Sequence, residues 1–285
     1  MDKSALKTII VKTMAVAFTG LALSLSACTK QSSAGKSPAT DNTTEQTQTL
    51  RIAAAANLSD VLPDIVAGYK ADNNLSEPDI EVTYASSGKL YAQIIAGAPY
   101  DIFLSANREF PAKLATDKSA KGAESHEPFT YTQGQLALYS VKHSLENIDQ
   151  GTLSDLFKND KTTKITIASP ELAPYGASAK AYLQSQQFYD SLAEKKRLIQ
   201  AENIGQAFQY AHTGSVDYGF VAQSQIVAIK AKPEEFITLA PESYPAILQD
   251  GVMISDTAVA TDFTSYLLSP AGQKYFAEAG YIAVR

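Results

Sequence analysis

Residues 80–106, with the sequence IEVTYASSGKLYAQIIAGAPYDIFLSA, predict a strand, a helix and a second strand in close succession. Apolar side chains alternate over residues 80–84 and then recur at helical spacing over residues 90–95. The apolar run over residues 100–106 is typical of a buried strand. Because strands joined by a helix-length crossover usually pair in parallel, this stretch predicts an α/β fold with a parallel sheet.

The same alternation extends to both sides of this stretch. Further strands are expected at residues 50–56, 135–141, 165–168 and 217–222, and further helices at 58–69, from 175, from 204, at 259–267 and at 275–279. The chain of 285 residues is large for one sheet, and passages near residues 127–135 and 240–245 would let it leave one lobe and return. We therefore expect a two-lobed α/β fold with a ligand cleft between the lobes, each lobe being a mainly parallel sheet flanked by helices. Lobe 1 is expected to comprise residues 49–130 and about 241–285, and lobe 2 residues 131–240.

The first 27 residues have the features of a bacterial export signal peptide. Three lysines precede a short apolar core at residues 15–25, shorter than the roughly 20 residues of a membrane-spanning helix. Residues 25–28, LSAC, resemble the lipobox of bacterial lipoproteins, which predicts that Cys28 is lipidated; a buried structural cysteine is the alternative. Residues 28–48 lack large aliphatic side chains and are expected to form a flexible tether. The prediction is a periplasmic or cell-envelope protein that meets a membrane only through its lipid anchor.

The charge of the chain limits its partners. The formal net charge is −6, and removal of the signal peptide would make it more negative, because that segment holds three lysines and one aspartate. Nucleic acid is not expected as a partner, since it is bound by basic surfaces. An anionic ligand would have to be attracted by local groups, against the overall field. The single cysteine excludes an internal disulfide and any multi-cysteine metal site.

Four predicted strand-to-helix junctions carry small polar residues or glycine. They are AAAANLSD at 53–60, YASSGKL at 84–90, SPELAPYGASAK at 169–180 and AENIGQAF at 201–208. Each one alone is explained by helix capping, which contributes about 1 kcal/mol and needs no ligand. The carboxyl ends of parallel strands meet at one edge of a sheet, so four such junctions together point to an anion site built from helix N-termini.

The donors at these junctions are neutral, which limits the class of anion. They include the Asn57 amide, serine hydroxyls, the Tyr175 hydroxyl and backbone N–H groups. A phosphate that keeps a proton needs an acceptor for it, and the junction cores offer no carboxylate, although Asp60 and Glu202 lie near. A fully ionised tetrahedral oxyanion such as sulfate, molybdate or tungstate needs donors only.

Several motifs of enzymes are incomplete or absent. The segment SSGKL resembles part of a phosphate loop, but the complete loop motif, the HExxH zinc motif and the GxSxG nucleophile elbow are missing from the sequence. His126, His143 and His212 show neither metal-ligand nor triad spacing. An exported serine hydrolase using Ser86 or Ser87 is the alternative from a different class, and it would require a base near that serine. We expect no enzymatic activity and no cofactor.

The chain resembles the molybdate-binding proteins of bacterial ABC importers, which are type II periplasmic binding proteins. The resemblance is carried by AAAANLSDVLPDI (53–65), YASSGKLYAQIIAGAPYDIFLSA (84–106), PELAPYGASAKAYL (170–183), GFVAQSQI (219–226) and YLLSPAGQKYFAEAGY (266–281). It implies a binding protein that holds a dehydrated oxyanion between two lobes and delivers it to the membrane subunits of an ABC permease. Molybdate is the expected ligand and tungstate a plausible one, with sulfate or another tetrahedral oxyanion as the alternative; a monomer is expected.

The resemblance also implies site residues. The expected oxyanion ligands are Asn57, Ser87, Tyr175 and Ile204, with Ala56 and Ser86 as secondary candidates. Ile204 could contribute only its backbone N–H, Ser86 is expected to cap or support the helix, and Lys89 is expected to face solvent. Many members of the family have a ligand tyrosine where this chain has Ala222. Tyr175 is expected to supply the missing phenol, with Gln223 as the other possibility.

Overall fold

The computed structural model describes residues 49–73, 79–117, 126–149, 152–159 and 162–284. The predicted signal peptide (1–27), the predicted lipidation site Cys28 and the predicted tether (28–48) lie outside these residues and stay predictions. Within the described ranges, no helix combines the length and apolar character needed to cross a bilayer.

The described residues alternate between strands and helices. The strands are β1 (Leu50–Ala55), β2 (Ile80–Ala85), β3 (Ile102–Leu104), β4 (Phe129–Gly134), β5 (Leu136–Tyr139), β6 (Ile165–Ala168), β7 (Leu198–Ala201), β8 (Tyr218–Ala222), β9 (Phe236–Thr238) and β10 (Ile247–Met253). The α-helices are α1 (Leu62–Asp72), α2 (Ser87–Ile95), α3 (Glu109–Thr116), α4 (Leu153–Asn159), α5 (Pro174–Ser185), α6 (Tyr189–Glu194), α7 (Ile204–His212), α8 (Gln223–Ala228), α9 (Ala258–Leu268) and α10 (Pro270–Glu278). Short 3₁₀ turns lie at η1 (Ala56–Leu58), η3 (Pro233–Glu235) and η4 (Pro241–Ser243).

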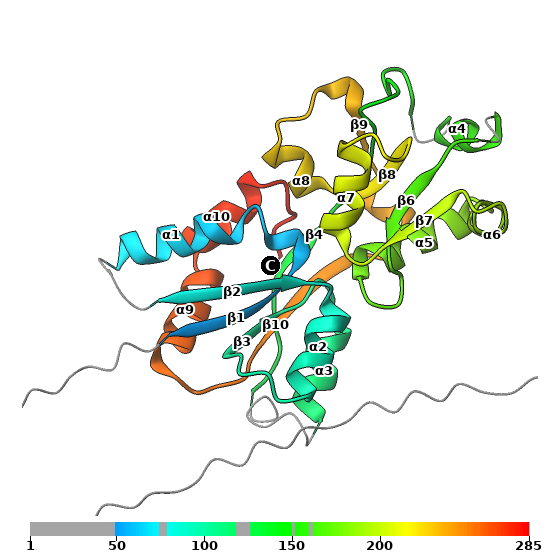
Figure 1. The fold of residues 1–285 in the computed structure, drawn as a ribbon. Helices are drawn as coiled ribbons and strands as arrows, with labels where there is room; N and C mark the ends of the chain where they lie inside the picture. The colour runs from blue at the N-terminus through cyan, green and yellow to red at the C-terminus, as the bar shows by residue number, and fades with distance from the viewer. Residues whose placement is uncertain (1–48, 74–78, 118–125, 150–151, 160–161, 285) are drawn as a thin grey trace, which may run out of the picture. The chain divides into compact units, whose positions relative to one another are not determined.

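The first sheet has the strand order β2-β1-β3-β10-β4 and is covered by helices on both faces (Figure 1). Successive residues of β1 point to opposite faces, as the strand geometry requires. Ile52 and Ala54 pack in the cluster that includes α1, α9 and α10. Ala53 packs instead with Phe103 and Val252 against α2 and α3. We call this sheet with these five helices lobe 1.

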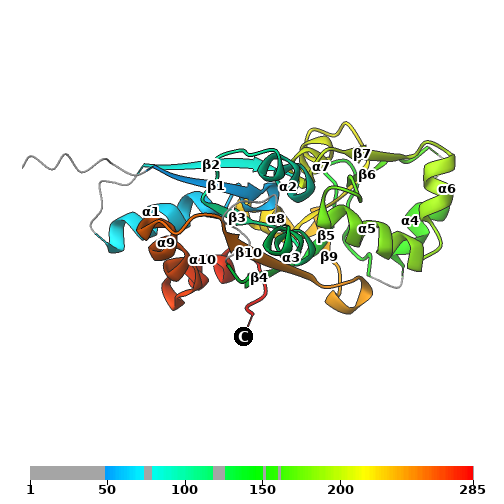
Figure 2. The ribbon, with the colours of Figure 1, turned by 90° about the horizontal axis from the view of Figure 1, so that it is seen from below.

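The second sheet repeats this plan with the order β7-β6-β8-β5-β9. Figure 2 shows α5, α6 and α7 beside its strands β6 and β7. Leu138 and Phe220 pack on one face in the cluster that includes α4, α5 and α6. Ala137 and Val221 pack on the other face with α7 and α8. We call this sheet with helices α4–α8 lobe 2. The α/β class and the two-sheet organisation therefore agree with the sequence analysis.

Both sheets are mixed, so the prediction of mainly parallel sheets is wrong for half of the strand pairs. In lobe 1, β1 pairs in parallel with β2 and β3, whereas β10 pairs antiparallel with β3 and β4. In lobe 2, β6 pairs in parallel with β7 and β8, whereas β5 pairs antiparallel with β8 and β9. The reason is that β5 and β10 enter their sheets from the other lobe without an α-helical crossover, which parallel pairing requires.

The chain passes twice between the two sheets. Only Gln135 separates β4 from β5, and residues 239–246 lead from β9 to β10. Because β4 pairs with β10 as far as Gly134, the sheets favour a first lobe boundary at Gln135 over the expected boundary after residue 130. The second passage includes the expected boundary near residue 240.

Candidate functional site

The four predicted junctions meet around one small cavity. Its volume is about 10 Å³, roughly the space that one water-sized sphere occupies. The cavity is lined by Ala55, Ala56, Asn57, Ala85, Ser86, Ser87, Ala106, Ala173, Pro174, Tyr175, Asn203 and Ile204. All six residues that the sequence analysis named as ligands or secondary candidates thus lie around the same space.

Helix N-termini from both lobes open onto this cavity. The turn η1 and helix α2 come from lobe 1, and helices α5 and α7 come from lobe 2. Local sequence explains two of these starts: Pro174 occupies the first turn of α5, where a missing N–H is tolerated, and the Asn203 side chain accepts a hydrogen bond from the Gln206 N–H at 3.0 Å. The N–H groups of a first turn have no intrahelical acceptor, and the helix dipole is positive there. The cavity is therefore suited to an anion.

The two serines of the ASS turn differ in their contacts. The Ser87 hydroxyl accepts a hydrogen bond from the buried Ala106 N–H at 2.9 Å. The Ser86 hydroxyl is buried and has no hydrogen-bond partner among the described residues. Ser86 occupies the N-cap position of α2, as expected, but its side chain makes no capping hydrogen bond. Ser86 is consequently the serine whose hydrogen-bonding capacity is unused.

The Asn57 amide faces a network that the sequence analysis did not predict. Its Nδ2 group donates to Gln249 Oε1 and to the Tyr281 hydroxyl, both at 3.0 Å. The Tyr281 hydroxyl in turn donates to the Asn57 carbonyl at 2.8 Å. The Asn57 Oδ1 atom is buried without a partner among the described residues. The amide hydrogens that were expected to serve the ligand are therefore already bonded within the protein in this conformation.

Gln249 in β10 connects this network to lobe 2. Its Nε2 group donates to the Tyr175 hydroxyl at 3.2 Å, while Tyr131 donates to its Oε1 at 3.0 Å. Gln249 and Tyr131 are fully buried and Tyr175 is 1% exposed. The only sequence signal for Gln249 is a pair of polar residues, Gln249 and Asp250, inside the apolar strand ILQDGVM.

The tyrosines of this network remain protonated at neutral pH. Burial raises the pKa of Tyr175 well above its ordinary value, and the neighbouring Tyr281 and Tyr131 raise it further. Burial likewise raises the pKa of Tyr131 and of Tyr281. The Tyr175 hydroxyl accepts from Gln249, and no acceptor for its proton is found among the described residues. It is therefore available as a neutral hydrogen-bond donor.

Direct contacts between the lobes close the surroundings of the cavity. The Gly88 N–H, near the start of α2, donates to the Leu172 carbonyl of lobe 2 at 2.9 Å. Lys89 of lobe 1 forms an ion pair with Glu202 of lobe 2, and both side chains are about half exposed. Lys89 does face solvent, as expected, but it also joins the two lobes. The conformation is thus one in which the lobes touch.

Residues 50–282 match the family described as bacterial extracellular solute-binding protein. The molybdate-binding protein ModA of Azotobacter vinelandii is 30% identical over 240 residues, which are 83% of this chain and 90% of that protein. ModA of Rhodobacter capsulatus is 31% identical over 235 residues, 81% of this chain and 86% of that protein. The solved structure of the Azotobacter vinelandii periplasmic molybdate-binding protein superimposes with a TM-score of 0.72 at 29% identity, covering 83% of this chain and 100% of that one.

The chain belongs to the bacterial extracellular solute-binding protein family. Its α/β fold with two helix-flanked sheets matches the fold of the Azotobacter protein. The family is one of binding proteins, which speaks against the alternative of an exported serine hydrolase. The contacts agree with this: His126 contacts Asp256, His143 contacts Asp217, and His212 contacts a tyrosine, and none lines the cavity.

Ala222 is the position at which the resemblance implies a ligand tyrosine, and the structure shows its surroundings. Ala222 ends β8, is fully buried and does not line the cavity. Gln223, the other possible substitute for the family tyrosine, accepts from the Thr238 hydroxyl at 2.7 Å and is also absent from the cavity wall. Of the two expected replacements, only Tyr175 lies at the cavity.

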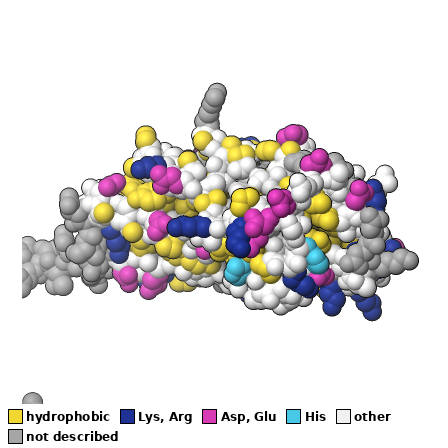
Figure 3. Space-filling view, turned by 90° about the horizontal axis from the view of Figure 1, so that it is seen from above, with side chains coloured by type: hydrophobic (Ala, Val, Ile, Leu, Met, Phe, Trp, Pro, Cys, Tyr) yellow, Lys and Arg dark blue, Asp and Glu magenta, His cyan; other side chains and the backbone are white. Residues whose placement is uncertain are grey.

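The electrostatics of the cavity of this solute-binding protein rest on neutral groups. None of the residues that line it carries a charged side chain. On the face shown in Figure 3, acidic and basic side chains are mixed among uncharged ones, and the described residues form no continuous basic surface there. Attraction for an anion must therefore come from the local N–H and O–H dipoles.

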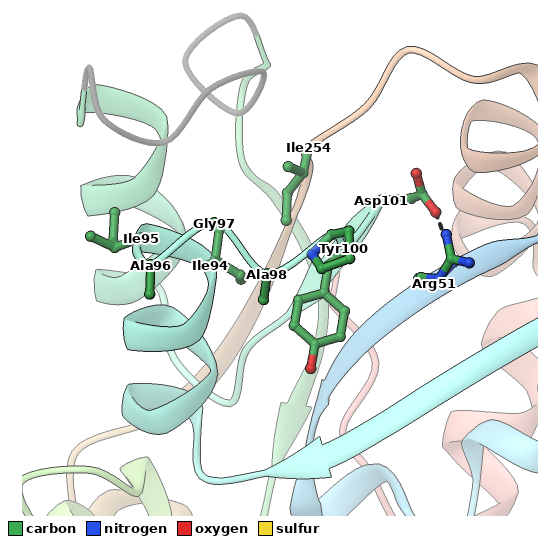
Figure 4. Close-up of a pocket in the computed structure, with 10 residues that line it drawn as sticks. Arg51, Ile94, Ile95, Ala96, Gly97, Ala98, Tyr100, Asp101 and Ile254 are labelled. Carbon is green, nitrogen blue, oxygen red and sulfur yellow. Dashed lines mark hydrogen bonds between the residues drawn. The ribbon is translucent and has the colours of Figure 1, made fainter. Parts of the chain in front are cut away.

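A larger cavity, of about 610 Å³, lies elsewhere in lobe 1 (Figure 4). The end of α2 and the loop that follows line it, with Ile94, Tyr100 and Ile254 contributing apolar surface. At its edge the Arg51 N–H donates to the Asp101 carboxylate at 2.8 Å. This cavity contains none of the four junctions and offers no convergence of helix N-termini, so size alone does not identify the functional site.

Proposed function

We propose that this solute-binding protein captures molybdate, and also tungstate, outside the cytoplasm and delivers it to the membrane subunits of an ABC permease. One observation carries the proposal: a cavity between two lobes is lined only by uncharged residues, at four points where strands give way to helices. Donors without acceptors suit a fully ionised tetrahedral oxyanion. The molybdate-binding function of the relatives in Azotobacter and Rhodobacter supports the same ligand.

The proposed ligand groups come from both lobes. Lobe 1 supplies Asn57 and the Ser87 and Ser86 hydroxyls, with the Ala56 backbone beside them. Lobe 2 supplies the Tyr175 hydroxyl and the Ile204 N–H. The free hydroxyl of Ser86 makes it a primary candidate and no longer a secondary one. Asn57 can donate to the ligand once the ligand displaces one of its two present acceptors, Gln249 or Tyr281.

Ligand entry requires the lobes to separate. A tetrahedral oxyanion is larger than the water-sized space of about 10 Å³ in this conformation. The lobes are joined by the two passages at Gln135 and residues 239–246, which are the natural place for a hinge. In the proposed cycle the lobes open at these passages, admit the anion and close on it, so that water is excluded and each donor contact is strengthened.

The proposal includes how the protein is held at the cell envelope. Lipidation of Cys28, after removal of residues 1–27, would anchor the protein to a membrane through the tether at 28–48. The LSAC sequence and the lack of any other cysteine support this. We propose a monomer, because two lobes of one chain supply all the candidate donors.

Titration calorimetry of the mature protein with molybdate, tungstate, sulfate and phosphate tests the proposed function. We expect tight binding of molybdate and tungstate and weaker binding of sulfate. We expect no binding of phosphate, because the cavity offers no carboxylate to accept the proton that phosphate keeps at neutral pH. Sulfate binding as tight as molybdate binding would make this a general oxyanion-binding protein. The absence of heat with all four anions would refute the site.

A further inference from the structure

Among the described residues, Gln249 is the only fully buried glutamine that forms hydrogen bonds with candidate ligand residues of both lobes. It lies in β10, the strand that returns the chain from lobe 2 to lobe 1, at an irregularity of its pairing with β4. Its Oε1 atom accepts from Asn57 of lobe 1, and its Nε2 group donates to Tyr175 of lobe 2. Gln249 does not line the cavity itself.

We propose that Gln249 is a positioning residue for oxyanion binding, which holds the Tyr175 hydroxyl in the orientation that donates to the ligand. The inference rests on the proposed function. A phenol carries one proton, and a neighbour that accepted this proton would take it away from the ligand. Because Gln249 presents an N–H group to the Tyr175 oxygen, it occupies an acceptor site of the hydroxyl and leaves the proton free.

The orientation of the Gln249 amide is itself fixed by its surroundings. The single proton of the Tyr281 hydroxyl goes to the Asn57 carbonyl, so the Asn57 side-chain atom beside that hydroxyl is the donor Nδ2. Because Nδ2 also stands 3.0 Å from Gln249 Oε1, this end of the Gln249 amide is the acceptor and the other end is the donor. The Tyr131 hydroxyl lies 3.0 Å from the same Oε1 atom and 2.8 Å from the Ser105 carbonyl. The donor state of Tyr175 in lobe 2 is thus determined by residues of lobe 1.

Gly134 provides the space in which the Gln249–Tyr175 hydrogen bond forms. It is the last residue of β4, directly before the passage between the lobes. A Cβ atom at this position would collide with the Tyr175 hydroxyl oxygen and would lie 2.7 Å from Gln249 Nε2. A side chain at 134 would therefore separate this pair while leaving both residues in the protein.

A double-mutant cycle on molybdate affinity tests the proposal. The variants are Gln249→Met, which keeps the volume and removes the amide, Tyr175→Phe, which removes only the hydroxyl, and the combination of both. Calorimetry gives each dissociation constant, and thermal unfolding confirms that each variant is folded. Gln93→Met is the matched control, because Gln93 also bonds a tyrosine hydroxyl, that of Tyr100 at 3.1 Å, away from the cavity.

We expect Gln249→Met to weaken molybdate binding about tenfold in the wild-type background and about twofold or less in the Tyr175→Phe background. Equal effects in both backgrounds, or no effect in either, would overturn the proposal while leaving the proposed function intact. If Gln249→Met does not fold, Gln249→Leu replaces it in the same cycle with the same expectation. A wild-type protein that binds no oxyanion would overturn the proposed function and this inference with it.

Discussion

Replacing Ser86 by alanine should have opposite effects on folding and on ligand binding. In the structure its hydroxyl is buried, caps nothing and has no partner among the described residues. A buried polar group without a partner costs about 1–3 kcal/mol, so its removal should not lower the stability of the ligand-free protein. If the hydroxyl donates to the bound oxyanion, its loss should cost about 1.5–3 kcal/mol of binding free energy, the range for hydrogen bonds to charged groups. The dissociation constant should then rise roughly 10- to 150-fold.

Ser87→Ala is the matched comparison, because the adjacent Ser87 hydroxyl already accepts a hydrogen bond within the protein, although its proton remains available to the ligand. Its replacement leaves the buried Ala106 N–H without an acceptor, which should lower the stability by about 1–3 kcal/mol. For a protein of this size, each 1 kcal/mol corresponds to a fall of about 2–4 °C in the melting temperature. Thermal unfolding without ligand and calorimetry with molybdate give both quantities for both variants.

The result that would refute this reasoning is specific. If Ser86→Ala lowers the melting temperature as far as Ser87→Ala does, the Ser86 hydroxyl has a structural partner in solution. If Ser86→Ala binds molybdate with unchanged affinity while Ser87→Ala binds weakly, Ser86 is not a ligand. The original assignment from the sequence, with Ser87 as the ligand serine, would then stand.

Three further predictions concern other parts of the molecule. Lys89→Ala should weaken molybdate binding by only about twofold to fivefold, because it removes a surface ion pair with Glu202. In calorimetry at high salt the difference from wild type should vanish, and a loss of affinity that does not depend on salt would contradict the role of this ion pair. Burial raises the pKa of Tyr175 and Tyr281, so the free energy of unfolding should be unaffected by these groups below about pH 10, where tyrosine ionises in the unfolded chain. Above that pH the free energy of unfolding should fall by about 1.4 kcal/mol per pH unit for each of the two tyrosines. Urea unfolding at several alkaline pH values measures this, and a flat profile would contradict it. Cys28→Ala should move the protein from the membrane fraction to the soluble fraction and abolish labelling by a fatty-acid probe, and retained labelling would exclude Cys28 as the lipidation site.

The sequence predicted the fold well because its main determinant is local. The switch between alternating and helical spacing is contained in windows of a few residues, and it located the strand–helix–strand units of both lobes. The antiparallel half of each sheet was missed because it depends on where the chain returns. No local pattern distinguishes β10, which arrives from the other lobe, from a strand that follows a helical crossover.

The meeting of the four junctions was predicted from the sequence, but the hydrogen bonding around them was not. Helix N-termini are marked by short motifs, and these motifs brought Asn57 and Tyr175 to one cavity. The network behind them joins residues far apart in sequence: Asn57 and Gln249 are separated by 192 positions. Likewise, which serine of the pair Ser86 and Ser87 remains free depends on the position of the Ala106 N–H, which only the folded chain fixes.

In the proposed site, Tyr175 takes the place of the tyrosine that the resemblance implies at position 222. A buried tyrosine hydroxyl needs a partner, and Tyr175 finds it in Gln249, which belongs to the sheet of the opposite lobe. The hydrogen bond that orients this donor therefore exists only when lobe 2 lies against β10. Opening of the lobes should break it and closure should restore it, so orientation of the phenol and closure of the cleft are one event. In such a site only the closed conformation binds the ligand tightly. Substitutions at Gln249 or Gly134 should therefore mainly increase the rate at which the ligand dissociates.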